Sequence, residues 1–279
     1  MTVSYQAMRG LANVPWFWAT SQYEVANSTP GLVLTASATS HAKGAWTQVF
    51  SSTASESALL FFAVSAVATA ATETSMLVDL AVGASGSEQA ILSGLAVGGA
   101  PVASAVALGI GAPLPVRIPA GSRISARIQS LIPSDTATLA CAVVSLPGRA
   151  LLPTSVDVLG TSAATSRGTA LSGASGSWTQ ITDSTPQRYR GVFVVPSVIG
   201  TDLVNQFSAT LSIGVGAAGS EVTLGTQRMQ YRDTESAFIE ANVPQFPIAC
   251  DIPAGSRIAV KHNIAANPDR YGVCLVGIP

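Results

Sequence analysis

The feature that most constrains the fold is a heptapeptide that occurs twice, Ile-Pro-Ala-Gly-Ser-Arg-Ile at 118–124 and at 252–258. Apolar and polar residues alternate on both sides of each copy, with a period of two that is typical of a half-buried strand. Ile-Pro-Ala-Gly favours a type I β-turn, with proline second and glycine fourth. Each copy therefore predicts a strand, a turn and a second strand.

Other motifs recur in the same order. Gly-Ala-Trp-Thr-Gln at 44–48 returns as Gly-Ser-Trp-Thr-Gln at 176–180, and Gly-Ala-Ser-Gly-Ser-Glu at 83–88 returns as Gly-Ala-Ala-Gly-Ser-Glu at 216–221. The displacement drifts by single residues between motifs, as expected when loops change length between rigid elements. We infer that one unit has been duplicated.

The duplication also resolves an ambiguous apolar run at 57–72, which on its own fits a buried helix or a short membrane segment. Its counterpart at 190–196 is rich in valine and ends in a proline, which indicates a strand. We therefore expect a strand at 59–64. The run is also shorter than the roughly 20 apolar residues that a membrane-spanning helix needs, so no membrane association is predicted.

Short strands between glycine-rich turns predict an all-β chain of two tandem antiparallel β-sandwich domains, with a jelly roll as the favoured version. The predicted boundaries are an N-terminal arm at 1–30, a first sandwich at 31–148, a linker at 149–168 and a second sandwich at 169–279. The arm contains Trp16-Phe17-Trp18. It is expected either to dock on a neighbouring subunit, since aromatic residues are favoured interface anchors, or to pack back on the first sandwich.

Charge is scarce along the chain. Only 10% of the 279 residues are charged, the net charge is −1, and the mean hydropathy is +0.42. No basic surface is expected to bind nucleic acid. A surface with so few charges favours association, so we expect a homo-oligomer whose neighbours cover much of it. The first residues lack the basic and apolar regions of a signal peptide, so secretion is not expected.

Three cysteines do not make a disulfide framework. Cys141 and Cys274 fall at matching places in the repeat, and their apolar neighbours predict buried thiols. A bridge between Cys250 and Cys274 is the alternative.

Glu88 and Glu221, with Arg123 and Arg257, recur once per copy. They predict either two equivalent ligand sites or, preferably, a structural ion pair or a carboxylate bonded to turn amides that was duplicated with the fold. Trp46 and Trp178 are predicted to be framework residues for the same reason.

Catalytic, cofactor and metal sites are not predicted. Asp79 with Glu88 suggests a metal site, but the second copy has Ser212 in place of Asp79. His41 is expected in a loop and His262 on an inward face, so neither supports a catalytic triad. Gly214 to Gly219 fit Gly-x-Gly-x-x-Gly, yet a strand-like sequence follows instead of a helix.

The order Trp-Thr-Gln, Gly-x-x-Gly-Ser-Glu, Ile-Pro-Ala-Gly-Ser-Arg-Ile resembles a module of predicted virion proteins of tailed bacteriophages, and the resemblance covers 44–147 and 176–279. It implies a non-enzymatic particle component, assembled in the host cytoplasm into the virion, as capsid decoration, head fibre, collar or tail accessory protein. Other virion proteins would be its partners. The alternative hypothesis is a carbohydrate-binding or host receptor-binding module, with a host surface glycan as ligand.

Overall fold

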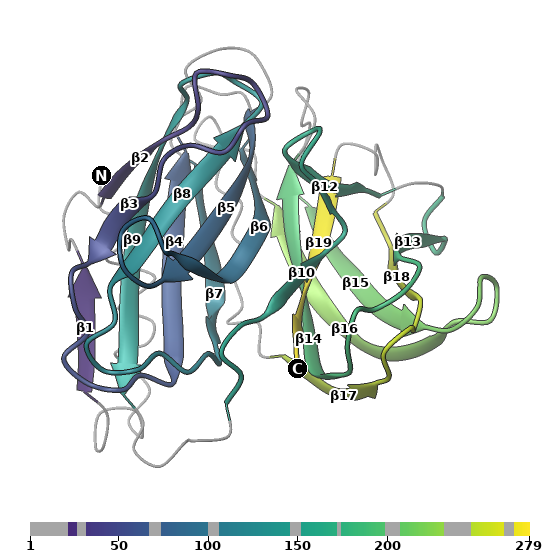
Figure 1. Cartoon of the computed structure of the whole chain (residues 1–279). Coiled ribbons are helices and arrows are strands. Elements are labelled where there is room, and N and C mark those ends of the chain that lie inside the picture. The colour runs from purple at the N-terminus through teal and green to yellow at the C-terminus, as the bar shows by residue number, and fades with distance from the viewer. Residues whose placement is uncertain are drawn as a thin grey trace.

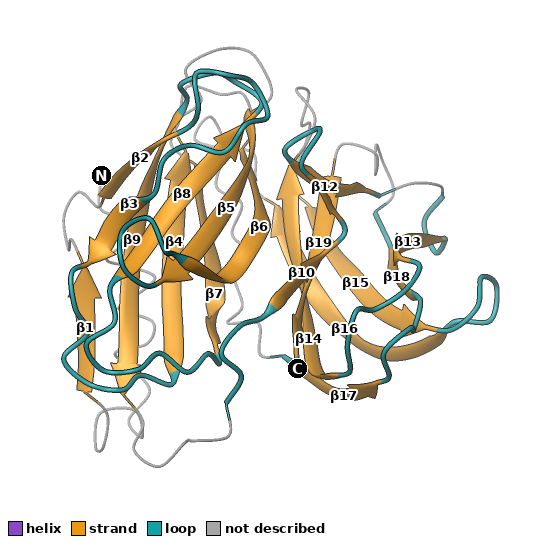
Figure 2. Ribbon diagram, in the orientation of Figure 1, coloured by secondary structure: helices purple, strands orange, loops and turns teal. Residues whose placement is uncertain are grey.

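The chain is all-β in every part that the structure describes. The computed structural model describes residues 22–26, 32–66, 74–99, 106–145, 152–171, 174–198, 207–231, 247–264 and 271–279. In these ranges the regular structure is strand, without a helix, and the paired strands are antiparallel (Figure 2). The predicted fold class is confirmed.

The first part of the chain forms two sheets, which we call the first sandwich. One sheet has the order β1-β9-β4-β7, with β2 also paired to β9, and contains β1 (Gln22–Ala26), β2 (Leu32–Thr35), β4 (Leu59–Ala66), β7 (Val106–Leu114) and β9 (Thr136–Ser145). The other has the order β3-β8-β5-β6, and contains β3 (Thr47–Phe50), β5 (Thr74–Val82), β6 (Gln89–Gly99) and β8 (Ile124–Ser130).

The rest of the chain forms two further sheets, the second sandwich, which lies beside the first (Figure 1). One sheet has the order β11-β12-β19-β14-β17, with β10 also paired to β19, and contains β10 (Asp157–Leu159), β11 (Thr161–Ser162), β12 (Arg167–Ala170), β14 (Tyr189–Val198), β17 (Ile248–Ile252) and β19 (Tyr271–Ile278). The other has the order β13-β18-β15-β16, and contains β13 (Trp178–Thr182), β15 (Phe207–Val215), β16 (Val222–Tyr231) and β18 (Ile258–His262).

The strand order is that of a jelly roll, and it occurs in both sandwiches. From β2 to β9 the chain crosses between the two sheets at each step, except that β5 and β6 are neighbours in one sheet. The second sandwich repeats the pattern, with β13 to β19 in the places of β3 to β9. Two facing sheets with this order are the jelly-roll form of an antiparallel sandwich.

The ambiguous apolar run is a strand, as predicted. β4 spans Leu59–Ala66, and Leu60, Phe62 and Val64 are buried in the core. The domain boundaries stay a prediction, but two of the assigned ranges contain unexpected strands. β1 lies within the range taken as arm and pairs with β9, while β10, β11 and the start of β12 lie within the range taken as linker. Trp16-Phe17-Trp18 falls outside the described residues.

The repeated heptapeptide does form a turn, but the type I assignment is wrong. Ser122 N–H donates to the Pro119 carbonyl at 3.3 Å, so the turn starts one residue later than predicted and places Gly121 third. Gly121 and Gly255 have φ of 76° and 79°. A positive φ at the third position is what a type II turn requires, which explains the glycine better than the fourth position of a type I turn.

All three cysteines are free thiols, so the bridge between Cys250 and Cys274 is absent. Cys141 and Cys274 are both buried, as predicted, and burial raises the pKa of each to about 12. They do not occupy matching sites, however. Cys141 pairs with the core residue Phe62, whereas Cys274 pairs with Val195 and receives a hydrogen bond from the backbone of Ala96 in the first sandwich. A one-residue shift in register turns a side chain to the other face of a strand.

Candidate functional site

Each sandwich contains the same ion pair beside its Gly-Ser-Glu turn. Arg123 Nη1 lies 2.9 Å from Glu88 Oε1 and 3.3 Å from the Gly83 carbonyl oxygen. Arg257 Nη1 lies 2.8 Å from Glu221 Oε1 and 3.0 Å from the carbonyl oxygen of Gly216. Nε of each arginine donates to a glutamine of the Trp-Thr-Gln motif, Gln48 or Gln180. The structural ion pair predicted from the repeat is therefore confirmed.

These pairs join the three repeated motifs into one structural unit. The hydrogen bond from Arg123 lowers the pKa of Glu88, and the Gly86 N–H, 2.9 Å from Oε2, lowers it further. Burial raises the pKa of Glu221, but Arg257 and backbone amides outweigh it, so the pKa of Glu221 is lowered too. Each arginine thus binds a carboxylate and a turn carbonyl through Nη1 and a glutamine side chain through Nε. Each arginine therefore ties the Gly-Ser-Glu turn to the strand that carries the Trp-Thr-Gln motif.

The two repeated tryptophans are also held in place by cations. The guanidinium of Arg127 lies 4.1 Å from the ring centroid of Trp46, and Nζ of Lys261 lies 4.7 Å from that of Trp178. On Trp178 the ring also covers Gly214, because a Cβ built there would lie 2.5 Å from the indole Cη2. Trp178 is thus packed between a backbone and a cation, which fits a framework role.

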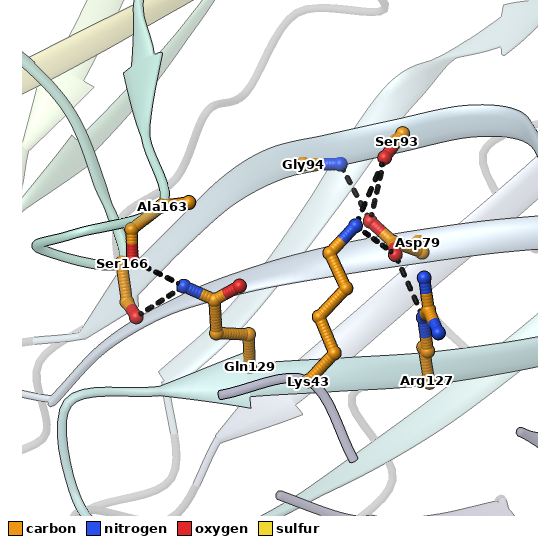
Figure 3. Close-up of polar contacts among 8 residues, drawn as sticks. All are labelled: Lys43, Asp79, Ser93, Gly94, Arg127, Gln129, Ala163 and Ser166. Atoms are coloured by element: carbon orange, nitrogen blue, oxygen red, sulfur yellow. Dashed lines mark hydrogen bonds and ion pairs between the residues drawn. The ribbon is translucent and has the colours of Figure 1, made fainter. Parts of the chain in front are cut away.

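A polar cluster in the first sandwich has no counterpart in the second. Asp79 is 3% exposed, and its Oδ2 lies 2.7 Å from Lys43 Nζ and 2.8 Å from Arg127 Nε. Its Oδ1 accepts hydrogen bonds from Gly94 N–H at 2.7 Å and from Ser93 Oγ at 3.1 Å (Figure 3). We call these five residues the Asp79 cluster.

The cluster holds a buried charge by bonding both carboxylate oxygens. Burial raises the pKa of Asp79, but the hydrogen bonds from Lys43 and Arg127 and the one from Gly94 outweigh it, so the pKa is lowered overall. Gly94 belongs to an irregularity in β6, where its φ of 75° aims the N–H at the carboxylate. A buried carboxylate is tolerated only when it is paired and hydrogen-bonded in this way.

The face of the first sandwich that carries the Asp79 cluster also contacts the second sandwich, and we call this contact the seam. Gln129 Nε2 donates to the carbonyl oxygen of Ala163 at 2.5 Å and to Ser166 Oγ at 3.0 Å (Figure 3). His41 Nδ1 lies 3.0 Å from the same hydroxyl. A backbone hydrogen bond also crosses the seam, since Val156 N–H donates to the carbonyl oxygen of Ile91 at 2.9 Å.

The structure places the predicted site residues apart. Asp79 and Glu88 are held by different cations, so the imagined metal site does not assemble. His41 lies in a loop, as predicted, and His262 is 1% exposed, with Nδ1 accepting a hydrogen bond from Ile264 N–H at 3.2 Å. The glycines at 214–219 lie at the end of β15 and in the turn that follows it, and the next element is the strand β16 and not a helix, as expected from the sequence.

Sequence reasoning missed Lys43, Ser93, Gly94 and Gln129. The signal that was present is the break in the repeat at Asp79, where the second copy has Ser212. No group of three His, Cys, Asp or Glu side chains in the described ranges is arranged to hold a metal ion. Within the same ranges, the structure has no helix with the length and apolar character needed to span a bilayer.

No protein-family model and no curated protein sequence matches this chain. Two solved structures are similar to it at low identity. One, described as the crystal structure of the STIV MCP, is 10% identical with a TM-score of 0.38, over 93% of this chain and 96% of that chain. The other, described as the triple jelly roll fold and turret assembly in an archaeal virus, is 11% identical with a TM-score of 0.22, over 90% of this chain and 59% of that chain. At these TM-scores the likeness carries no argument, and the jelly-roll assignment rests on the strand order above.

Proposed function

We propose that this chain is a non-enzymatic structural component of a virus particle, that of a tailed bacteriophage. The observation that carries the proposal is the jelly-roll strand order present twice in one chain, with the second sandwich packed on the outer face of the first. Jelly rolls serve as building units of viral capsids, and two joined units present two copies of a wall-forming module at once. The duplicated Arg–Glu pairs and clamped tryptophans support a framework built for rigidity.

Low charge supports the proposed mode of action, which is self-association and docking on other virion proteins. With only 10% charged residues, the chain has little electrostatic repulsion to oppose contact with its neighbours. Its place in the particle would be capsid decoration, head fibre, collar or tail accessory protein.

Locating the chain in purified particles tests the proposal. We expect an epitope-tagged chain to co-purify with particles through a density gradient and to be located by imaging as repeated copies at symmetric positions. A chain that is expressed during infection but absent from purified particles would overturn the proposal.

A deletion in the N-terminal segment tests whether the arm docks the chain on the particle. Removing residues 1–30 would also remove β1, which pairs with β9, so the deletion should stop before Gln22. We expect a chain that lacks residues 1–21 to stay folded and to be lost from particles. Normal incorporation of this variant would exclude the docking role of the arm.

The alternative, a carbohydrate-binding or receptor-binding module, receives no support from the repeated tryptophans. Trp46 and Trp178 each have a cation over the ring, so one face of each indole is already occupied, and the Trp178 ring also packs on Gly214. Glycan-array binding by the purified chain, lost on mutation of an exposed loop residue, would favour this alternative.

A further inference from the structure

One buried serine hydroxyl takes part in two of the side-chain hydrogen bonds that cross the seam. Ser166 is 0% exposed, and its Oγ lies 3.0 Å from Gln129 Nε2 and 3.0 Å from His41 Nδ1. Gln129 is also buried, and its Nε2 donates to the carbonyl oxygen of Ala163, which can only accept. The side-chain nitrogen of Gln129 is therefore the donor to Ser166 Oγ as well.

The hydrogens of this network determine the protonation state of His41. Because Ser166 Oγ accepts a hydrogen bond from Gln129, its own hydrogen is left to donate. Among the described residues, Oγ has no acceptor in hydrogen-bond reach other than His41 Nδ1. Nδ1 accepts only in the neutral imidazole that carries its hydrogen on Nε2. The seam as the structure shows it therefore contains a neutral His41.

A second proton on the imidazole is incompatible with this arrangement. An imidazolium has no acceptor nitrogen, so it either donates to Ser166 Oγ or turns away from it. In both cases the hydroxyl hydrogen of Ser166, which is buried in the seam, loses its acceptor. A buried donor without an acceptor destabilises the contact that buries it, and here that contact is the seam.

The backbone at both residues favours separation once the hydrogen bond is lost. In the described ranges, three residues other than glycine have a positive φ, and two of them, His41 at 58° and Ser166 at 53°, contact each other across the seam. Such conformations are sparsely populated and persist where the surrounding contacts hold them. Loss of the contact between the two side chains removes part of what holds both turns in place.

The described surroundings of His41 provide no carboxylate that contacts the ring. Two segments lie against it, residues 124–135, where the Ser130 carbonyl accepts a hydrogen bond from His41 N–H, and residues 163–167. The charged side chains on these segments and on the one that carries His41 are three cations and one carboxylate, Lys43, Arg127, Arg167 and Asp135. The Asp135 carboxylate binds Ser130 Oγ and a backbone N–H, and that of Asp79 is bound within its own cluster. A proton on His41 thus adds to an excess of positive charge.

The titratable group belongs to the copy whose face is covered by the seam. The second copy, aligned through the repeated motifs, has Gly173 in place of His41 and Asn263 in place of Gln129. Glycine takes a positive φ without the steric cost that a side chain adds. The first copy therefore has a histidine in a left-handed conformation at a position where its counterpart has a glycine.

We propose that protonation of His41 loosens the contact between the two sandwiches, so that the seam is closed near neutral pH and opens in mild acid. The inference goes beyond the proposed function and does not rest on it, because it concerns a contact within one chain. Histidine is the side chain whose charge ordinarily changes between about pH 5 and 8, and the chain has one other, His262. His262 lies on β18, whereas the strands of the second sandwich that contact β6 belong to the other sheet.

Hydrogen exchange of the full chain, measured by mass spectrometry at about pH 7.5 and about pH 5.5, tests the proposal. After correction for the intrinsic effect of pH, we expect the protection of residues 160–167 to fall about tenfold at the lower pH, because a buried donor loses its acceptor. The protection of residues 258–262, around His262, should stay the same. His41→Asn tolerates the left-handed backbone and does not titrate, so its protection at 160–167 should be equal at both pH values.

Ser166→Gly separates the proposed cause from other effects of acid. Glycine keeps the left-handed conformation and removes the hydroxyl, so a protonated His41 no longer leaves a buried hydrogen without an acceptor. Its protection at 160–167 should then not depend on pH in this range. Thermal unfolding at both pH values should show that the variants are folded, and the result for the wild-type chain requires neither of them. Equal protection of the wild-type chain at both pH values, or an undiminished loss in His41→Asn, would overturn the proposal.

Discussion

The two sandwiches share a strand order, yet at one pair of equivalent positions they differ in kind. Asp79 pairs with Arg127 in the first sandwich, and Ser212 pairs with Lys261 in the second, in the same register. Asp79 holds two cations, whereas Ser212 Oγ lies 2.9 Å from Thr226 Oγ1 in a neutral contact. Topology is therefore not the source of the difference.

The source is one side chain and one extra residue. In β6, two residues lie between Leu92 and Leu95, the partners of Leu80 and Val78. In β16, one residue lies between Gly225 and Gln227, the partners of the equivalent residues Ile213 and Leu211. The extra residue creates the bulge that brings Gly94 N–H to the Asp79 carboxylate. The first sandwich uses this cluster next to a face that is covered by the second, whereas the equivalent face of the second sandwich is more exposed. A duplicated fold can thus have one face specialised for burial and its twin for solvent.

The largest expected effect comes from removing the charge at the centre of this difference. Asp79→Ala should lower the free energy of unfolding by about 3 kcal/mol, because a buried carboxylate is lost from between two cations that keep their charge. Lys43 and Arg127 are partly exposed, so water limits the loss. Chemical denaturation measures it, and Ser212→Ala is the matched control, expected to change stability by less than about 0.5 kcal/mol. Equal losses for the two variants would contradict the asymmetry.

The next effect concerns the contact between the Trp178 ring and Gly214, which the first sandwich lacks. Gly214 lies under the Trp178 ring, whereas its equivalent in the first sandwich, Ala81, already carries a Cβ and is buried. Gly214→Ala should cost about 2 kcal/mol, because the indole must move to admit the methyl group. Thermal unfolding and the fluorescence of the tryptophans would report it. Ala81→Gly is the control, and a cost as large as that of Gly214→Ala would show that the ring is not the cause.

A smaller effect concerns the seam. Gln129→Ala should cost about 1.5 kcal/mol, because the Ala163 carbonyl and the Ser166 hydroxyl lose a buried donor. Its equivalent, Asn263, is exposed, so Asn263→Ala should cost less. Hydrogen exchange measured by mass spectrometry should show faster exchange at 160–167 in Gln129→Ala alone. Unchanged exchange there would mean that this side chain does not hold the seam.

The smallest expected difference is in sensitivity to acid. The pKa values of Glu88 and Glu221 are lowered in both sandwiches, and Glu56 and Asp251 add one exposed carboxylate of lowered pKa to each. Asp79, whose pKa is also lowered, is the additional one in the first sandwich. A lowered pKa gives stability that is present above the pKa of the unfolded chain and is lost as the pH falls through the folded value. As the pH falls from 6 to 3, the protection of backbone amides against hydrogen exchange should therefore decrease at a higher pH in the first sandwich than in the second. Asp79→Asn should reduce this difference. A decrease that comes at a higher pH in the second sandwich would contradict this prediction.

Several parts of the fold could be predicted because they depend on local sequence. The repeated motifs, the alternation around Ile118 and Ile252, and the valine-rich run at 192–195 gave the strand class and the duplication. The Arg123–Glu88 pair was predicted because each residue recurs in the second copy at nearly the same displacement, with Glu221 133 residues after Glu88 and Arg257 134 residues after Arg123. The type I turn was wrong because Pro-Ala-Gly-Ser and Ile-Pro-Ala-Gly are both acceptable turns, and the hydrogen bond of Ser122 and the positive φ of Gly121 are needed to distinguish them.

Other parts depend on contacts between distant segments. The linker assignment overlooked β10 to β12 because these strands have only two to four residues and lie in a stretch rich in Gly, Ser and Thr. They are strands because β10 and β12 pair with β19, and β11 pairs with β12. Cys141 and Cys274 were matched by sequence, and a register shift placed them on opposite faces. The Asp79 cluster brings together residues from a loop, three strands and a bulge, and no local sequence pattern predicts contacts between such distant residues.

The sequence by itself determined that this chain is built of strands, that its unit occurs twice, and that one arginine and one glutamate recur with it in each copy, because periodicity and repetition are properties of the chain alone. Only the tertiary structure decided which face of which copy is covered, and hence that Asp79 is buried while Ser212 stays in reach of water. Burial is decided by how distant surfaces meet, and the cost or benefit of a charge follows from that environment and not from the residue type.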